Sequence, residues 1–124
     1  MSLSTMVGQI PGVTAAADLS AKQYYMVTLA SETTCNVAGA GEVAAGILIN
    51  EPESGDACDI FSHGEGEVKV AAALVINSPF KSDASGLAVL ADTDTDHIVG
   101  WTRSAATAAG DVVKCLVAPG SLSV

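Results

Sequence analysis

Aromatic side chains are scarce in this sequence of 124 residues. Only Tyr24, Tyr25, Phe61, Phe80 and Trp101 are aromatic, whereas alanine occurs 21 times and valine 14 times. Aromatic side chains bury the largest area per residue, so a core made mostly of Ala and Val is thin for this length. This shortage excludes a core of stacked rings, and it predicts that further apolar surface is buried between subunits of an oligomer.

Basic residues are also few. Five Lys and Arg stand against 14 Asp and Glu, which gives a net charge of −9. Binding to phosphates depends on Lys and Arg side chains that act together, and the basic residues here are scattered along the chain. The charge therefore argues against nucleic acid and against anionic membranes as partners.

Long hydrophobic runs are absent. The run from Val70 to Phe80 is too short for a membrane-spanning helix and contains Pro79. Residues 1–17 carry no charged side chain, and no Lys or Arg precedes Lys22, so the basic region that opens a signal peptide is missing. We expect neither a membrane span nor a cleaved leader.

The chemistry of metal sites and of catalysis is poorly represented. Cys35, Cys58 and Cys115 are odd in number and far apart in sequence, so we predict buried, reduced thiols, as suits a protein assembled in cytoplasm. His63 and His97 lack the ligand spacing of a zinc site. No Gly-x-Ser-x-Gly elbow is present. We predict no metal, no cofactor and no enzymatic activity.

One acidic segment has the pattern of a cation loop. Asp92, Asp94 and Asp96 alternate as at the start of a calcium loop, but His97 and Arg103 stand where Gly and Glu are required. The favoured interpretation is a solvated turn, and a weak cation site is the alternative.

The apolar residues themselves form short β-prone runs at intervals of about eight to twelve residues, which is typical of a small barrel or sandwich. We predict an all-β fold of short antiparallel strands with little helix, limited to single turns within residues 14–23 and 104–109. A tight turn is expected at residues 63–66. The predicted strands are Tyr24–Leu29, Thr33–Val37, Val43–Ile49, Ala57–Ser62, Glu67–Ala72, Phe80–Ser82 and Leu87–Leu90, followed by the strands on either side of the Ser104–Ala109 loop.

Two stretches of the chain share one pattern. Val43–His63 and His97–Val117 each contain a small-residue strand, a loop, a Gly-Asp turn and a returning apolar strand. Glycine supplies positive φ at such turns, and Asp bonds its own backbone there. The spacing from the strand glycine to the turn is one residue longer in the second copy. The pattern predicts two related hairpins and an approximate internal repeat.

The N-terminal region differs from the rest. Residues 1–17 read as an extended arm punctuated by Gly and Pro, and residues 18–124 as a single β domain. The apolar side chains of the arm are sticky for a free tail, so we predict that it orders against a partner. The predicted contact residues of the arm and body are Leu3, Met6, Val7, Ile10, Val13, Tyr24 and Trp101.

Several segments in this order resemble the small capsid decoration (cement) proteins of tailed bacteriophages. The run from Ala17 to Tyr25 (ADLSAKQYY) is similar to the opening of these head-stabilising proteins. The later segments that carry the resemblance are Ala45-Gly46-Ile47-Leu48 with Pro52, Gly55-Asp56, Asp83-Ala84-Ser85-Gly86, Val99-Gly100-Trp101 and Gly110-Asp111-Val112-Val113. The likeness extends over residues 17–117.

The resemblance implies an all-β subunit, often a homotrimer, on the outer capsid surface of the virion. It implies binding to major capsid proteins at or near three-fold positions, with no cofactor and no catalysis. The family carries no fixed functional residues, so the contact residues above rest on the physical argument alone. Two alternatives remain open: another virion component, such as a head fibre base or a tail-associated β domain, and a small-ligand or carbohydrate-binding β module.

Overall fold

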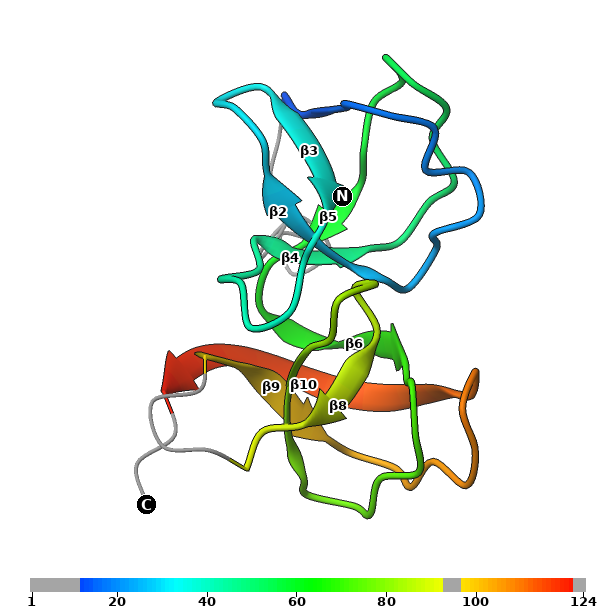
Figure 1. The fold of residues 1–124 in the computed structure, drawn as a ribbon, viewed down its shortest axis with the longest axis vertical. Helices are drawn as coiled ribbons and strands as arrows, with labels where there is room; N and C mark the ends of the chain where they lie inside the picture. Colours follow the sequence, from blue (N-terminus) through cyan, green and yellow to red (C-terminus); the bar gives the residue numbers. More distant parts are fainter. Residues whose placement is uncertain (1–11, 93–96, 122–124) are drawn as a thin grey trace, which may run out of the picture.

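The computed structural model describes residues 12–92 and 97–121, and every regular element in these ranges is a β-strand (Figure 1). The predicted all-β class is therefore confirmed. Within the described residues, no helix of membrane-spanning length and hydropathy occurs. The strands are β1 (Thr14–Ala15), β2 (Met26–Leu29), β3 (Thr34–Val37), β4 (Gly46–Leu48), β5 (Ile60–Phe61), β6 (Gly64–Lys69), β7 (Pro79–Ser82), β8 (Ala88–Leu90), β9 (His97–Thr102) and β10 (Val112–Ser121).

The strands form two five-stranded sheets, one in each half of the chain. The first sheet has the order β1-β3-β2-β4-β5 and makes up the upper lobe of Figure 1, and the second has the order β6-β10-β9-β7-β8 and makes up the lower lobe. All neighbouring strands run antiparallel except β1 and β3, which are parallel. The expected antiparallel pattern thus holds with one exception.

Each sheet curls until its two edges meet. In the first half, an antiparallel bridge joins Thr14 of β1 to Ala57, just before β5. In the second half, a parallel bridge joins Val70, just after β6, to Ala88 of β8. Closure pairs the edge strands, which would otherwise expose unpaired N–H and C=O groups. Each half of the chain is therefore a small five-stranded barrel.

The two barrels repeat the same strand pairing. Position by position, the contacts of the first barrel recur in the second, including closure of the ring and the hydrogen bonds of the connecting loops. The pair Ile47–Phe61 of the first barrel corresponds to Trp101–Leu116 of the second, and Met26–Ile47 corresponds to Pro79–Trp101. In the same way, Val27–Val37 corresponds to Phe80–Leu90, and Ala15–Cys35 corresponds to Val70–Ala88. The predicted internal repeat extends beyond the two hairpins to whole halves of the chain.

A glycine stands at the same point of each barrel because a neighbouring strand passes too close for a side chain. A Cβ at Gly46 would lie 2.3 Å from the carbonyl oxygen of Phe61, and one at Gly100 would lie 2.1 Å from that of Leu116. Real Cβ atoms do not approach backbone oxygen so closely. Glycine is therefore required at both positions, because two backbones lie in close contact there. This requirement explains why Gly46 and Gly100 correspond in the sequence.

The two Gly-Asp turns also correspond. Gly55 has φ +86° and Gly110 has φ +91°, conformations that glycine adopts without steric cost. The carboxylate of Asp56 accepts a hydrogen bond from the Glu53 N–H at 3.2 Å, and that of Asp111 accepts from the Thr107 and Ala108 N–H groups at 3.0 and 3.2 Å. Each Asp therefore closes its own turn.

We expect the Asp111 turn to make stability depend on pH. Hydrogen bonds from the Thr107 and Ala108 backbone and from the Thr107 hydroxyl lower the pKa of Asp111. A lowered pKa in the folded state stabilises the fold above the ordinary carboxyl pKa, and this stabilisation disappears as the pH falls through the lowered value. Asp111→Ala should reduce Tm by a few degrees at neutral pH and by much less near pH ~3. Thermal unfolding at the two pH values measures this, with Asp59→Ala as the control. Equal losses at both pH values would contradict it.

Each barrel has its own core at equivalent positions. In the first barrel, Val27, Leu48 and Ile60 are fully buried, with Val13, Ala15, Leu19, Cys35 and Cys58 beside them. In the second barrel, these places are taken by Phe80, Thr102 and Cys115, with Val68, Val70, Leu74, Ala88 and Val113. Phe80 is the fully buried ring of this core, and Val27 takes the equivalent position in the first barrel. The prediction of a core dominated by small side chains is borne out.

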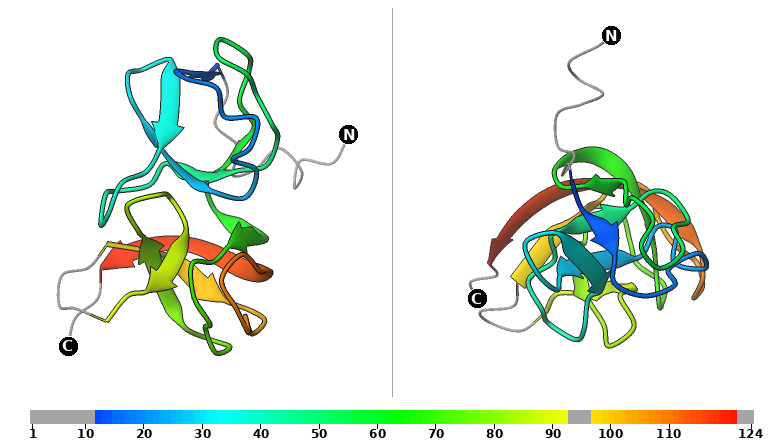
Figure 2. Two further views of the ribbon diagram at one scale, coloured as in Figure 1. Left: turned by 45° about the vertical axis from the view of Figure 1, so that its right-hand side comes forward. Right: turned by 90° about the horizontal axis from the view of Figure 1, so that it is seen from above.

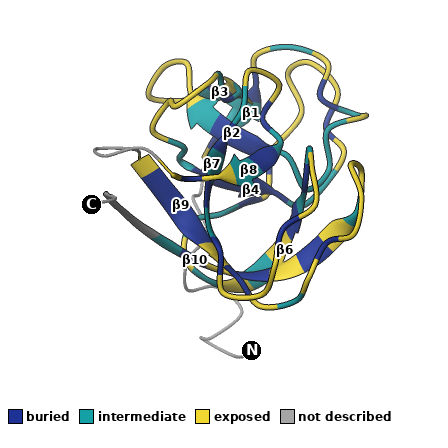
Figure 3. Cartoon of the chain, turned by 60° about the horizontal axis from the view of Figure 1, so that its bottom comes forward, coloured by how far each residue is buried: buried dark blue, intermediate teal, exposed yellow. Residues whose placement is uncertain are grey.

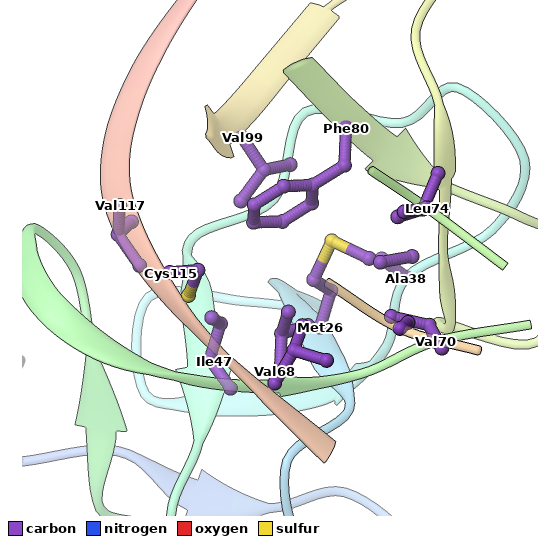
Figure 4. Packing of buried hydrophobic residues seen from close by; sticks show 13 residues of the cluster. Met26, Ala38, Ile47, Val68, Val70, Leu74, Phe80, Val99, Cys115 and Val117 are labelled. Atoms are coloured by element: carbon purple, nitrogen blue, oxygen red, sulfur yellow. The ribbon is translucent and has the colours of Figure 1, made fainter. Parts of the chain in front are cut away.

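The two barrels are joined by apolar contact. Met26, Ala38 and Ile47 of the first barrel lie in the same buried cluster as Val68 and Phe80 of the second (Figure 4). In β2 and β4, Met26 and Ile47 point into this shared cluster, whereas the next residues, Val27 and Leu48, point into the core of the first barrel. They do so because alternate side chains of a strand point to opposite faces. Because both faces of this strand are covered, residues 24–29 do not alternate between apolar and polar side chains in the sequence.

Three local predictions differ from the structure. Where short helical turns were expected, residues 16–23 and 104–109 form turns, bends and, at Ala106, an isolated β-bridge. The tight turn expected at residues 63–66 is instead the start of β6 at Gly64, and β6 pairs with residues 112–117 of β10. Alternating buried and exposed residues in β10 produce the banding visible in Figure 3. Finally, Thr14–Ala15 is a strand, although the sequence of this part of the arm has no β pattern of its own.

Candidate functional site

The predicted contact residues fall in three different settings. Leu3, Met6, Val7 and Ile10 lie outside the described residues. Val13 is 3% exposed and belongs to the core of the first barrel, so its side chain is not available to a partner. Tyr24 and Trp101 are accessible, but they lie in different barrels and belong to different surface features.

The last part of the predicted arm is built into the first barrel. The Thr14 and Ala16 N–H groups donate to the carbonyl oxygens of Thr33 and Cys35, and the Ala15 N–H donates to that of Asp56, each at 2.9 Å. Figure 2 shows β1, in blue, on the outside of the upper lobe. Any segment that extends from the body therefore begins before Gly12, several residues earlier than the predicted boundary at residue 17.

Tyr24 lies at the seam between the barrels. Its N–H donates to the carbonyl oxygen of Leu48 in the first barrel, and its carbonyl oxygen accepts from the Lys69 N–H at 2.9 Å at the start of the second. Its φ of +70° is in the left-handed region, which a bulky side chain rarely adopts. The equivalent residue of the second barrel is Asn77, with φ +64°, and Asn tolerates this conformation well. Tyrosine is therefore a costly choice for the backbone at this position.

A pocket of about 300 Å³ opens beside Tyr24 at the same seam. It contains one acidic and one basic side chain, a hydroxyl, an amide and an apolar wall. Its lining residues are Ser20, Ala21, Gln23, Tyr24, Glu51, Lys69 and Val112. A concave site that combines an aromatic ring with converging polar groups is the form expected of a small-ligand site.

Two of the five basic residues gather around one ring near this pocket. The Lys22 Nζ lies 4.8 Å, and the Lys69 Nζ 5.7 Å, from the centroid of the Tyr25 ring, within the range of cation–π attraction. Lys22 comes from the first barrel and Lys69 from the second. The seam therefore carries a local basic patch on a strongly acidic chain.

Trp101 is part of an exposed apolar strip on the second barrel. It is 39% exposed on β9, and it is directly opposite Leu116 of β10 and Pro79 of β7. Two other exposed apolar side chains, Val75 and Ile76, lie on the loop before β7 and are 72% and 56% exposed. The Val75 carbonyl oxygen accepts hydrogen bonds from Ser78 Oγ and Thr102 Oγ1, both at 2.7 Å, so the backbone of this loop is firmly held.

Val75 and Ile76 were missed because the sequence AAALVIN reads as one buried run. Alignment of the two halves would have separated them: Leu74 corresponds to the buried Leu19, as the Leu19 N–H bond to Pro52 and the Leu74 N–H bond to Ala106 show, and the residues that follow in the first half are polar. The exposed apolar side chains of the described residues are Leu29, Val43, Val75, Ile76, Leu90, Trp101, Val112 and Leu116.

The thiols are buried, as predicted from the sequence. Burial raises the pKa of Cys35 and of Cys115 to about 12, so both are protonated at neutral pH. Among the described residues, no group of three His, Cys, Asp or Glu side chains is placed to hold a metal ion. Most of the acidic loop at Asp92–Asp96 lies outside the described ranges.

The architecture defined by these features is a pair of small closed β-barrels that share a buried apolar cluster. No protein-family model and no curated protein sequence matches the chain. Among solved structures, the chain is similar to the base of the head fiber protein gp8.5 of bacteriophage phi29, described as its N base. The TM-score is 0.73 at 13% sequence identity, and the match covers 90% of this chain and 95% of the other. At this identity the likeness establishes a shared fold.

Proposed function

We propose that this protein is a structural component of a bacteriophage virion, attached to the outside of the head. The observation that carries the proposal is the fold likeness to a phage head fibre base over nearly the full length of both chains. The sequence features that resemble capsid decoration proteins point to the same location independently. The proposal assigns no catalytic role, no cofactor and no nucleic-acid partner to the chain.

Within this class, the base of a head fibre is the leading candidate, and a decoration subunit is the alternative. The fold likeness favours the base, because the matched structure is itself a fibre base. In either case the major capsid protein is the partner. A homotrimer would bind it with three linked weak contacts, and linkage of this kind raises avidity by orders of magnitude. The exposed apolar side chains of Trp101 and Leu116, which are neighbours on β9 and β10, supply surface for such subunit contact.

The uncharged residues 1–11 are the proposed capsid contact. They carry Leu3, Met6, Val7 and Ile10, and they directly precede the segment Val13–Ala16, which is hydrogen-bonded into the first barrel. A protein that binds the mature shell but not its precursor stabilises the mature lattice by mass action. We expect the purified chain to sediment with empty expanded heads of its phage and not with precursor shells.

The decisive comparison uses a chain that lacks residues 1–11. It should keep the thermal unfolding profile of the full chain while its co-sedimentation with expanded heads falls at least about tenfold, which corresponds to ~1.4 kcal/mol. The matched control is Trp101→Ala in the full chain, which tests the body surface instead. Undiminished binding by the shortened chain would place the contact on the barrels and overturn the role of the arm.

Imaging of the particle separates the two candidates. A fibre base should appear at a limited set of head sites with a longer appendage projecting from each. A decoration subunit should cover the lattice regularly and end at the barrel. Absence of the chain from purified particles would contradict both.

Ligand binding is a second candidate function, favoured by the pocket at the seam. Glu51 and Lys69 together suit a neutral ligand with donor and acceptor groups, and Tyr24 and Val112 offer an apolar wall, so a sugar ring is the best match. Titration with glucose, galactose and N-acetylglucosamine should give saturable NMR shifts at these residues. Tyr24→Asn, which copies Asn77 of the other barrel, should abolish them without unfolding the chain. No saturable shift with any of these sugars would remove this candidate.

A further inference from the structure

Two cysteines that are far apart in sequence meet inside the first barrel. The Sγ atoms of Cys35 and Cys58 lie 3.2 Å apart, although the residues are 23 positions apart in the chain. Both side chains are buried, at 0% and 5% exposure. The third cysteine, Cys115, is buried in the second barrel and belongs to a different cluster. No local pattern of residues predicts that these two cysteines meet, because their contact depends on closure of the barrel.

The pair connects the two neighbours of β1. Cys35 belongs to β3 and is the parallel partner of Ala15. Cys58 is on the other side, where its N–H donates to the carbonyl oxygen of Val13 at 2.9 Å. A bond between the two sulfur atoms would therefore pass behind β1 and fasten the segment on each side of it.

The second barrel shows that the sulfur atoms are not needed for packing. Ala88, paired with Val70, stands where Cys35 stands, and Val113, paired with Val68, stands where Cys58 stands. Both are buried in the second core. The barrel therefore closes with Ala88 and Val113 in one half and with two thiols in contact in the other. Because packing does not require sulfur at these positions, the thiols are explained better by their chemistry than by the space they fill.

We propose that Cys35 and Cys58 form an intramolecular disulfide when the chain meets an oxidising environment, and that this bond fastens β1 into the first barrel. With oxidised glutathione as the oxidant, the thiolate of one cysteine displaces one glutathione thiol, and the second cysteine then attacks the mixed disulfide and releases the other. The cysteines lose two protons and two electrons, and one oxidised glutathione becomes two reduced molecules.

The buried position of the Cys35–Cys58 bond determines when it forms and what it stabilises. Because both side chains are buried and burial raises the pKa of the Cys35 thiol, oxidation of the folded chain is slow, and the bond forms most readily during folding. Once formed, it restricts the unfolded chain and so raises stability. A protein assembled in a reducing cytoplasm and later released would gain this reinforcement at β1, which follows residues 1–11 in the sequence.

The test is refolding of the full-length chain with oxidised and reduced glutathione, followed by unfolding in a thiol-alkylating reagent and mass spectrometry. The expected product carries one alkyl group per chain, on Cys115, and a peptide cross-link between Cys35 and Cys58. Treatment with a reductant should restore three alkylated cysteines. Three free thiols after oxidative refolding, or a cross-link that includes Cys115, would overturn the proposal.

Stability supplies the second measurement. The Tm of the oxidised chain should exceed that of the reduced chain by several degrees. The double variant Cys35→Ala/Cys58→Val copies the second barrel and should fold with the same Tm in both redox conditions. A cross-linked wild-type chain with an unchanged Tm would refute the proposed reinforcement, even with the bond present.

Discussion

Replacement of Gly100 by alanine is expected to destabilise the protein by about 3 kcal/mol or more, a large part of the stability of a typical domain. The Cβ atom would lie 2.1 Å from the Leu116 carbonyl oxygen and 3.0 Å from the Leu116 carbonyl carbon. These are backbone atoms of β10, which pairs with β9 on one side and β6 on the other, so they cannot move away alone. Gly46→Ala should have the same effect in the first barrel, where the obstacle is the Phe61 backbone.

Gly39→Ala is the matched control. Its Cβ would approach the end of the flexible Glu42 side chain, which can rotate away with loss of one exposed hydrogen bond from the Gly39 N–H, so we expect only a small loss of stability. Chemical denaturation of the three variants measures the difference. If Gly100→Ala and Gly39→Ala lose similar stability, the close approach of the strands is not what fixes glycine at these two positions.

Removal of residues 1–17 should destabilise the body by roughly 3 kcal/mol or more, whereas removal of residues 1–11 should leave its stability nearly unchanged. The longer deletion takes away β1 and the buried side chains of Val13 and Ala15. It also leaves the Thr33, Cys35 and Asp56 carbonyl oxygens and the Gly55 and Cys58 N–H groups without their partners. Backbone groups that lose partners in a closed barrel carry a desolvation cost.

The comparison of the two deletions in the same thermal and chemical unfolding experiments tests this prediction. The comparison also shows which deletion is suitable for the binding experiment. A chain without residues 1–17 would lose capsid binding through a damaged barrel, whereas a chain without residues 1–11 keeps the barrel intact. Equal stability of the two shortened chains would show that β1 contributes little to the closure of the first barrel.

Much of the fold was predictable from local pattern. The strands at residues 26–29, 34–37 and 88–90 were predictable because each is a short run rich in β-branched and apolar residues. Turn-forming residues bound each run. The correspondence of Gly46 with Gly100 revealed the repeat, because glycine is required wherever two backbones approach closely. The low content of aromatic residues predicted a core of small side chains.

The candidate surfaces were less accessible to sequence reasoning. Val13 looked like a sticky arm residue, but it is core, because β1 gains its strand conformation only by pairing with β3 and with Ala57. Val75 and Ile76 were not among the predicted contact residues, yet they are exposed on a loop held by Ser78 and Thr102. In each case the deciding contact comes from a distant part of the chain.

Composition and periodicity alone were sufficient for the all-β class, the positions of most strands and the duplicated pattern, since these depend on neighbours within a few residues. The closure of each barrel, the seam that holds Tyr24 beside Lys69, and the meeting of Cys35 with Cys58 emerged only from the folded chain. They depend on which strands become neighbours across the ring, and that choice is made by the burial of the whole core rather than by any local run of residues.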